Sequence, residues 1–104
     1  MKRPARPPFK AKDRHPIDKG IAREVRVLWE NGVETFESCQ GGRGHPFTEP
    51  TVRFHGDQSE GLRALAVAIQ NGLGVTTLRR YYNIICGEAI GPYWEMTFRP
   101  RKTA

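Results

Sequence analysis

The sequence predicts an α+β domain in which two helices cover one face of a four-stranded, mostly antiparallel sheet. Two segments carry apolar residues at helical spacing, and each of them ends at an Asn-Gly pair. Each is followed by two segments that alternate as strands do. A chain of 104 residues is long enough for one such domain and too short for two cores. The expected order is therefore α-β-β-α-β-β.

In the first half of this pattern, Asp18 can cap a helix that ends at Asn31-Gly32. The apolar stripe of this helix consists of Ile21, Val25, Leu28 and Trp29. After it we expect a strand, a glycine-rich loop and a second strand, at 33–38, 39–50 and 51–55.

The second half begins with a helix that Ser59 can cap and that ends at Asn71-Gly72. Its expected stripe consists of Leu62, Leu65, Ala66 and Ile69, with Leu73 beyond its end. A third strand lies within 77–86, the sequence GEAIG forms a turn, and the fourth strand covers 92–99. This is the order of a ferredoxin-like fold whose first strand has moved to the end of the chain. Such a circularly permuted arrangement places the second and fourth strands in the centre, in the sheet order 3-4-2-1.

Alternation along the strands sorts their side chains between the helix-covered face and the open face. The residues expected to face the helices are Phe36, Val52, Phe54, Trp94, Met96 and Phe98. Those expected on the open face are Thr35, Glu37, Cys39, Thr51, Arg53, His55, Tyr93, Glu95, Thr97 and Arg99. Tyr81 and Tyr82 cannot both face the same side, and stacked tyrosines on an open sheet would suit nucleic-acid bases. The alternative is a solvated face whose Glu and Arg side chains pair across strands.

The net charge of +6 resides at the two ends of the chain. Residues 1–14 carry +5 and residues 99–104 carry +3, whereas residues 15–98 carry −2. We therefore expect three parts. Residues 1–16 form a basic, Pro-rich, disordered N-terminal segment that is solvated and has no core of its own. One domain covers 17–99, and a basic tail covers 100–104. Such ends can bind nucleic acid weakly and in a salt-dependent way.

Other features of the sequence limit where the protein acts. It has no run of about 18 apolar residues, so no membrane span or membrane partner is expected. The basic first residues are not followed by the apolar stretch of a secretory signal. Two cysteines are too few for a disulfide scaffold, so we expect the reducing cytoplasm.

The most unusual stretch is the loop sequence SCQGGRGH, from Ser38 to His45. Its consecutive amides could cradle an anion, with Arg43 adding charge. Alternatively, Cys39 could be a nucleophile that His45 or His55 activates. The possible zinc ligands are Cys39, His45, His55 and Cys86. Their spacing matches no zinc finger, so no metal and no cofactor is predicted. The plainest interpretation is a glycine hairpin with the cysteine packed at its base.

Around these motifs the chain resembles a family of short proteins from actinobacteria and their phages. The shared pattern is GVETFESCQGGRGHPFTEPTVRFHG, then GLRALAVAIQNGL, LRR and GPYWEMTF, and it covers about residues 17–99. The Ser-Cys-x-Gly core of the loop is also similar to a motif of wybutosine-synthesising tRNA methyltransferases. Further motifs of those enzymes are absent from this sequence, so neither resemblance implies an activity.

The sequence favours a small accessory binding module for an anionic or nucleotide-like ligand over an enzyme. Its site would join the loop to the open face and would consist of Glu37, Cys39, Gly41, Gly42, Arg43, Gly44, His45, Arg53, His55 and Glu95. Two alternatives stay open. One is a Cys39-dependent hydrolase or transferase in which Glu37 or Glu95 orients the histidine base. The other is an accessory protein that binds nucleic acid through its basic tails. An edge strand could also pair two copies of the chain into a homodimer.

Overall fold

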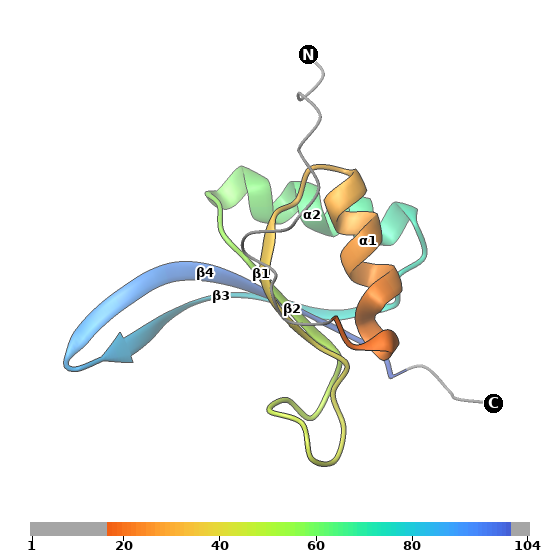
Figure 1. The fold of residues 1–104 in the computed structure, drawn as a ribbon. Helices are drawn as coiled ribbons and strands as arrows, with labels where there is room; N and C mark the ends of the chain where they lie inside the picture. Colours follow the sequence, from red (N-terminus) through yellow and green to blue (C-terminus); the bar gives the residue numbers. More distant parts are fainter. Residues whose placement is uncertain (1–16, 101–104) are drawn as a thin grey trace.

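The computed structural model describes residues 17–100 (Figure 1), so the expected N-terminal segment at 1–16 and the residues from 101 onward lie outside the described part. The elements are the short 3₁₀ helix η1 (Lys19–Ile21), α1 (Ala22–Glu30), β1 (Thr35–Cys39), β2 (Thr51–Phe54), α2 (Gln58–Gln70), β3 (Val75–Ile85) and β4 (Glu88–Phe98). The four strands form one antiparallel sheet in the order β1-β2-β4-β3, which confirms the predicted order. Neither helix among residues 17–100 has the length and apolar character needed to cross a membrane.

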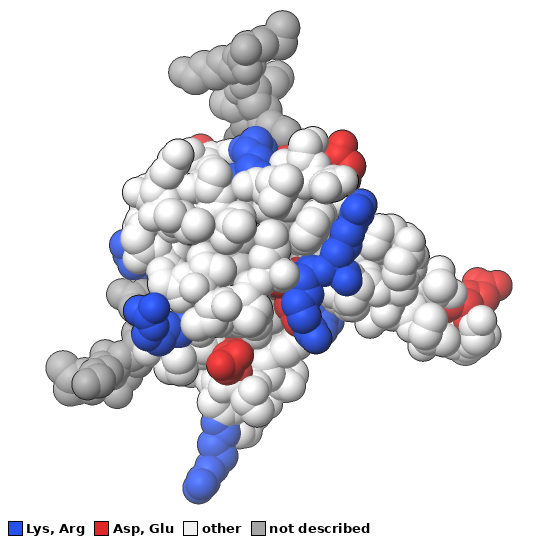
Figure 2. All heavy atoms as spheres, turned by 180° about the vertical axis from the view of Figure 1, so that it is seen from behind, with Lys and Arg blue, Asp and Glu red and all other residues white. Residues whose placement is uncertain are grey.

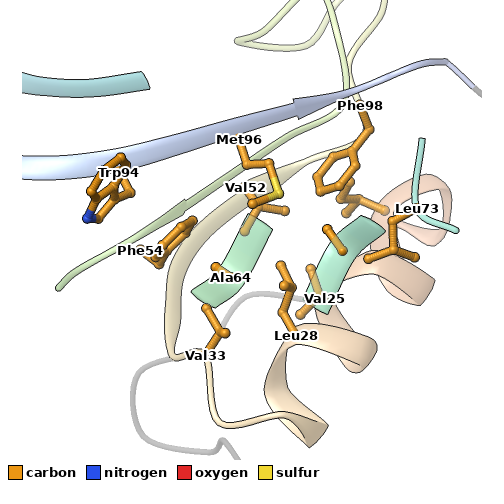
Figure 3. Packing of buried hydrophobic residues seen from close by; sticks show 12 residues of the cluster. Val25, Leu28, Val33, Val52, Phe54, Ala64, Leu73, Trp94, Met96 and Phe98 are labelled. Carbon is orange, nitrogen blue, oxygen red and sulfur yellow. The ribbon is translucent and has the colours of Figure 1, made fainter. Parts of the chain in front are cut away.

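The core lies between the two helices and one face of the sheet (Figure 3). For the two central strands, β2 and β4, the prediction of which side chains face the helices is confirmed, because these alternate residues are buried in this cluster. These residues are Val52, Phe54, Trp94, Met96 and Phe98. From α1 and the turn before it, Ile21, Val25 and Leu28 meet them and are also buried, as their spacing predicted.

The face that α2 buries agrees with the predicted one only in part: Leu65 packs against the core and Leu73 beyond the helix is buried, as expected. Leu62 and Ile69 are 54% and 64% exposed, although both belong to the expected stripe. The buried residues of α2 are instead Gly61, Ala64 and Ala68. The reason is the indole of Trp94, which lies so close to the helix that a Cβ added at Gly61 would be 2.3 Å from its ring. Small residues let α2 approach the sheet at this point, and Leu62 and Ile69 face solvent.

The helix starts also differ from the prediction. Asp57, not Ser59, caps α2, and its carboxylate accepts a hydrogen bond from the Glu60 amide at 3.0 Å. That bond, together with one from the Ser59 hydroxyl, holds the pKa of Asp57 below its ordinary value. Asp18 precedes η1 without capping it, because its carboxylate accepts the backbone amide of Gln40 instead. The helix ends at Asn31 and Asn71 agree with the prediction.

The hairpin of β3 and β4 is longer than predicted, because GEAIG belongs mostly to β4 and is not a turn. The turn is formed by Cys86 and Gly87, both at positive φ, as in the two-residue turns that match strand twist. Only the inner part of β4, Trp94–Thr97, pairs with β2. Residues 82–92, here called the arm, therefore project beyond the sheet, as Figure 1 shows.

The alternation of β1 is shifted by an irregularity between Thr35 and Glu37. Thr35 is buried and its hydroxyl accepts a hydrogen bond from the Trp29 indole at 2.7 Å, although we expected it on the open face. Phe36, expected inside, stacks on His55 of the open face. A bulge moves one residue to the other side of the sheet, and nothing in the spacing of this strand indicated it.

Candidate functional site

The open face of the sheet carries three parallel rows of side chains, because the four strands pair in register. The aromatic row consists of Phe36, His55, Tyr93 and Tyr81. The charged row consists of Glu37, Arg53, Glu95 and Arg79. The threonine row consists of Thr51, Thr97 and Thr77. Each row runs across the strands, so neighbouring members come from neighbouring strands.

Glu95 lies at the centre of the charged row and is only 3% exposed. Arg53 donates to its Oε2 from Nε and Nη2, at 3.1 and 3.0 Å, and Arg79 donates to its Oε1 from Nε at 3.0 Å and from Nη2. Burial alone would raise the pKa of Glu95, but the hydrogen bonds from Arg79 and Arg53 outweigh it and hold the pKa below its ordinary value. The glutamate is therefore charged and fully satisfied.

Arg53 joins the rest of the row to the glycine-rich loop. Its Nη1 donates to Glu37 Oε1 at 3.0 Å. Its guanidinium lies 4.7 Å from the ring centre of Phe47, which belongs to the loop, and 4.9 Å from that of Tyr81. A planar cation between two rings is held in a single orientation. Because two arginines and two glutamates alternate, the row carries no net charge.

The same balance of charge is visible on the surface (Figure 2). On the face shown, Lys and Arg atoms lie beside Asp and Glu atoms at the base of the projecting arm, and most of the remaining surface is neither basic nor acidic. This face therefore offers no patch of a single sign that would attract a polyanion by charge alone.

The aromatic row crosses the whole sheet. Phe36 stacks on His55 with ring centres 4.4 Å apart, and Tyr93 lies 5.2 Å from both rings. Tyr81 follows at 5.7 Å from Tyr93. Burial is the chief cause that raises the pKa of the Tyr81 phenol. Its hydroxyl has no hydrogen-bond partner among the described residues. A row of adjacent rings on an open sheet is a surface on which planar groups can stack.

On the other side of the charged row, the glycine-rich loop and the threonine row enclose a pocket of about 380 Å³. Its lining residues are Phe47, Thr48, Glu49, Thr51, Arg53, Thr77, Arg79, Glu95 and Thr97. Its lining combines threonine hydroxyls, two arginines, two glutamates and one ring, and its size suits a small organic group. Arg79 is 65% exposed on its side chain, so it can contact a ligand while it also binds Glu95.

The amides of the glycine-rich loop are used within the loop. The Gly41 amide donates to Cys39 Sγ at 3.4 Å, and the Gly42 amide donates to the carbonyls of Phe47 and Thr48 at 3.1 and 3.0 Å. These two amides are therefore not free to cradle an anion, contrary to the prediction. Gly44 and Arg43 lie in the exposed part of the loop, and neither lines this pocket.

The predicted cysteine and histidine residues separate into different regions. Cys39 is buried at the end of β1, with His45 close to it. His55 belongs to the aromatic row, and Cys86 is exposed in the turn of the arm. Glu37 and Glu95, the carboxylates expected to orient a histidine base, bind arginines of the charged row instead. The carboxylate that does approach Cys39 and His45 is Asp18, which sequence spacing alone could not place there.

Several members of the site were missed from the sequence. Arg79 and Tyr81 alternate within β3 as Tyr93 and Glu95 do within β4, and this was the available signal. Their side was not assigned, because Tyr81 and Tyr82 are adjacent and alternation alone does not say which of the two faces the helices. Phe47 gave no signal, since its contact with Arg53 depends on how the loop folds back over the sheet.

In comparisons with known proteins, the chain matches no family model, no curated protein and no solved structure. The resemblance to short actinobacterial and phage proteins therefore stays a prediction. The function has to be argued from the site itself.

Proposed function

We propose that the protein is a non-enzymatic module that binds single-stranded nucleic acid on the open face of its sheet. The observation that supports this most directly is the aromatic row, in which four adjacent rings cross all four strands. Stacking of a base on an aromatic side chain contributes about 1–3 kcal/mol and tolerates any base. Open four-stranded sheets that bind RNA use their aromatic side chains for two or three bases in this way.

The polar part of the open face suits the backbone of such a strand. Arg79 belongs to the charged row beside the aromatic row, and its side chain is 65% exposed, while the threonine row lies on the far side of the charged row. Hydroxyls can bind sugar and phosphate oxygens, and an arginine edge can bind a phosphate. Because the charged row is neutral, these contacts orient the strand more than they attract it.

The attraction is expected from the two ends of the chain. Residues 1–14 and 99–104 carry +5 and +3, whereas residues 15–98 carry −2. Basic residues outside the sheet would supply the salt-dependent part of the affinity, and the rings would supply a part that salt affects little. This combines the two binding hypotheses that the sequence suggested, a nucleotide-like ligand and basic tails.

The first experiment measures binding of fluorescent short oligouridylate by anisotropy at low salt. The double substitution His55→Ala and Tyr93→Ala should weaken binding about tenfold or more, because it removes the two central rings of the row. The matched control is Tyr82→Ala, which removes an exposed tyrosine of the arm that lies outside the row. Equal weakening by the control, or none by the double variant, would contradict the proposal.

A salt titration separates the sheet from the tails. Glutamine should replace the basic residues of the first segment, which are Lys2, Arg3, Arg6, Lys10, Lys12 and Arg14. This variant should show a shallower dependence of affinity on salt, because fewer counterions are released on binding. The ring variant should keep the original salt dependence at a lower affinity. If only the glutamine variant loses binding, the tails act alone and the open face is not the site.

A further inference from the structure

We propose that Asp18, Cys39 and His45 form a zinc site with three protein ligands, separate from the open face. One ligand atom of each residue lies within 4.8 Å of the other two. Ligands of a tetrahedral zinc ion, at about 2.0–2.3 Å from it, are roughly 3.5 Å from one another. A contraction of about 1 Å would therefore bring the three groups into coordination range. The site lies where the segment before η1 meets the glycine-rich loop.

The donor set selects the metal. A thiolate, an imidazole and a carboxylate together suit Zn²⁺, whereas Mg²⁺ and Ca²⁺ need oxygen ligands. Cys39 is buried, but Asp18 and His45 are about one-third exposed, so an ion can reach the site from solvent. Three protein ligands leave the fourth zinc position to a water molecule or a bound group.

Two backbone amides already support the first two ligands. The Gly41 amide donates to Cys39 Sγ at 3.4 Å, and the Gln40 amide donates to Asp18 Oδ2 at 3.1 Å. Gly41 has φ +79, and a Cβ on it would lie 2.3 Å from the Glu49 backbone. Only glycine can hold its amide in this position. Contacts of this kind orient metal ligands and tune their affinity.

The third ligand is arranged by the Gln40 side chain. Its Oε1 accepts the Gly20 amide at 3.0 Å, so its Nε2 donates to His45 Nε2 at 3.2 Å. The proton of neutral His45 then sits on Nδ1, which faces Asp18 Oδ2 at 3.8 Å. Zinc at Nδ1 would move that proton to Nε2, where it needs an acceptor. The Gln40 amide would have to turn its oxygen to His45 and release Gly20.

Glutamate at position 40 removes this conflict. A carboxylate of the same shape can accept both the Gly20 amide and the Nε2 proton of a zinc-bound His45. Gln40→Glu should therefore bind zinc more tightly than the natural chain.

The test uses the full chain, stripped with a chelator, kept reduced and titrated with Co²⁺. We expect one equivalent to produce the thiolate-to-cobalt absorption band and the visible bands of tetrahedral cobalt, and Zn²⁺ to abolish both. Cys39→Ser should lose the thiolate band, while Cys86→Ser, at the exposed cysteine, should keep it. Asp18→Asn and His45→Gln should weaken zinc binding by about 10–100-fold or more. Circular dichroism checks that each variant is folded.

Several outcomes would overturn the site. These are the absence of a thiolate band in the natural chain, a band that depends on Cys86, or unchanged affinity in both Asp18→Asn and His45→Gln. Unchanged or weaker binding by Gln40→Glu would overturn the assignment of Nδ1 as the ligand atom. The double variant of His55 and Tyr93 should keep the cobalt spectrum, so failure of the nucleic-acid proposal and failure of the zinc proposal remain distinguishable.

Discussion

The two faces of the sheet are built from the same strands but have opposite chemistry. On β2, Val52 and Phe54 are fully buried under the helices, while Arg53 between them belongs to the charged row of the open face. On β4, Met96 is buried in the core and Glu95 beside it binds two arginines. Adjacent residues therefore serve stability on one side and a polar, aromatic surface on the other. The comparison teaches that the two properties can be altered separately.

The physical reason lies in what each face gains from its contacts. Burial of an apolar side chain contributes about 1.5–3 kcal/mol, because its surface leaves water. A polar contact exchanges hydrogen bonds with water for hydrogen bonds within the protein, so its net contribution is about 1 kcal/mol. The covered face should thus dominate the free energy of unfolding.

The largest expected effect comes from opening a cavity in the covered face. Phe54→Ala should lower the free energy of unfolding by about 3–5 kcal/mol, because a fully buried ring is lost and the helices cannot close the space. Urea denaturation measures it. Leu62→Ala, on the exposed side of α2, is the matched control and should change stability by less than about 0.5 kcal/mol. Similar costs for both variants would mean that the core does not lie where the structure places it.

An added methyl group should disturb the same face by overpacking. Gly61→Ala should cost about 2 kcal/mol despite the better helix propensity of alanine, because its Cβ would lie 2.3 Å from the Trp94 ring. The check is a double-mutant cycle. In a Trp94→Leu background the ring is gone, so the extra cost of Gly61→Ala should nearly vanish. A cost that persists in that background would show that the close approach is not its cause.

On the open face, the largest effect on stability is expected at Glu95. Glu95→Gln should lower the free energy of unfolding by about 2 kcal/mol at neutral pH, because two arginines lose the carboxylate that binds them. Glu88→Gln, in the exposed arm, is the control and should have little effect. An equal effect at both positions would contradict the central place of Glu95 in the charged row.

The effect of Glu95→Gln should also depend on pH. The pKa of Glu95 is held below its ordinary value in the folded state, so its contribution is fully present above about pH 4.3, the ordinary pKa of a glutamate. It is lost as the pH falls through the lower folded-state pKa. The difference in stability between the natural chain and Glu95→Gln should therefore be constant from pH 7 to pH 5 and shrink below about pH 4. A difference that grows on acidification would contradict the sign of the shift.

Composition and alternation were enough to predict much of this architecture. They predicted two helices, four strands and the sorting of β2 and β4 between the two faces, while the sheet order came from the similarity of the element order to a permuted ferredoxin-like fold. The charged row followed in part, because Glu37, Arg53 and Glu95 occupy alternate positions in their strands. These are local properties: side chains alternate along any strand, and Asn-Gly ends a helix for backbone reasons alone.

Where contacts between distant segments decide the outcome, the sequence was insufficient. The bulge in β1 moved Phe36 to the open face, and the indole of Trp94 packs so close to Gly61 that small residues of α2 face the sheet while Leu62 and Ile69 face solvent. The loop folded back so that its ring at Phe47 covers Arg53. Asp18 came to lie beside Cys39 although 20 residues separate them in the chain. Such choices depend on which segments can pack together without clashes or unsatisfied polar groups, and that competition exists only in the folded chain.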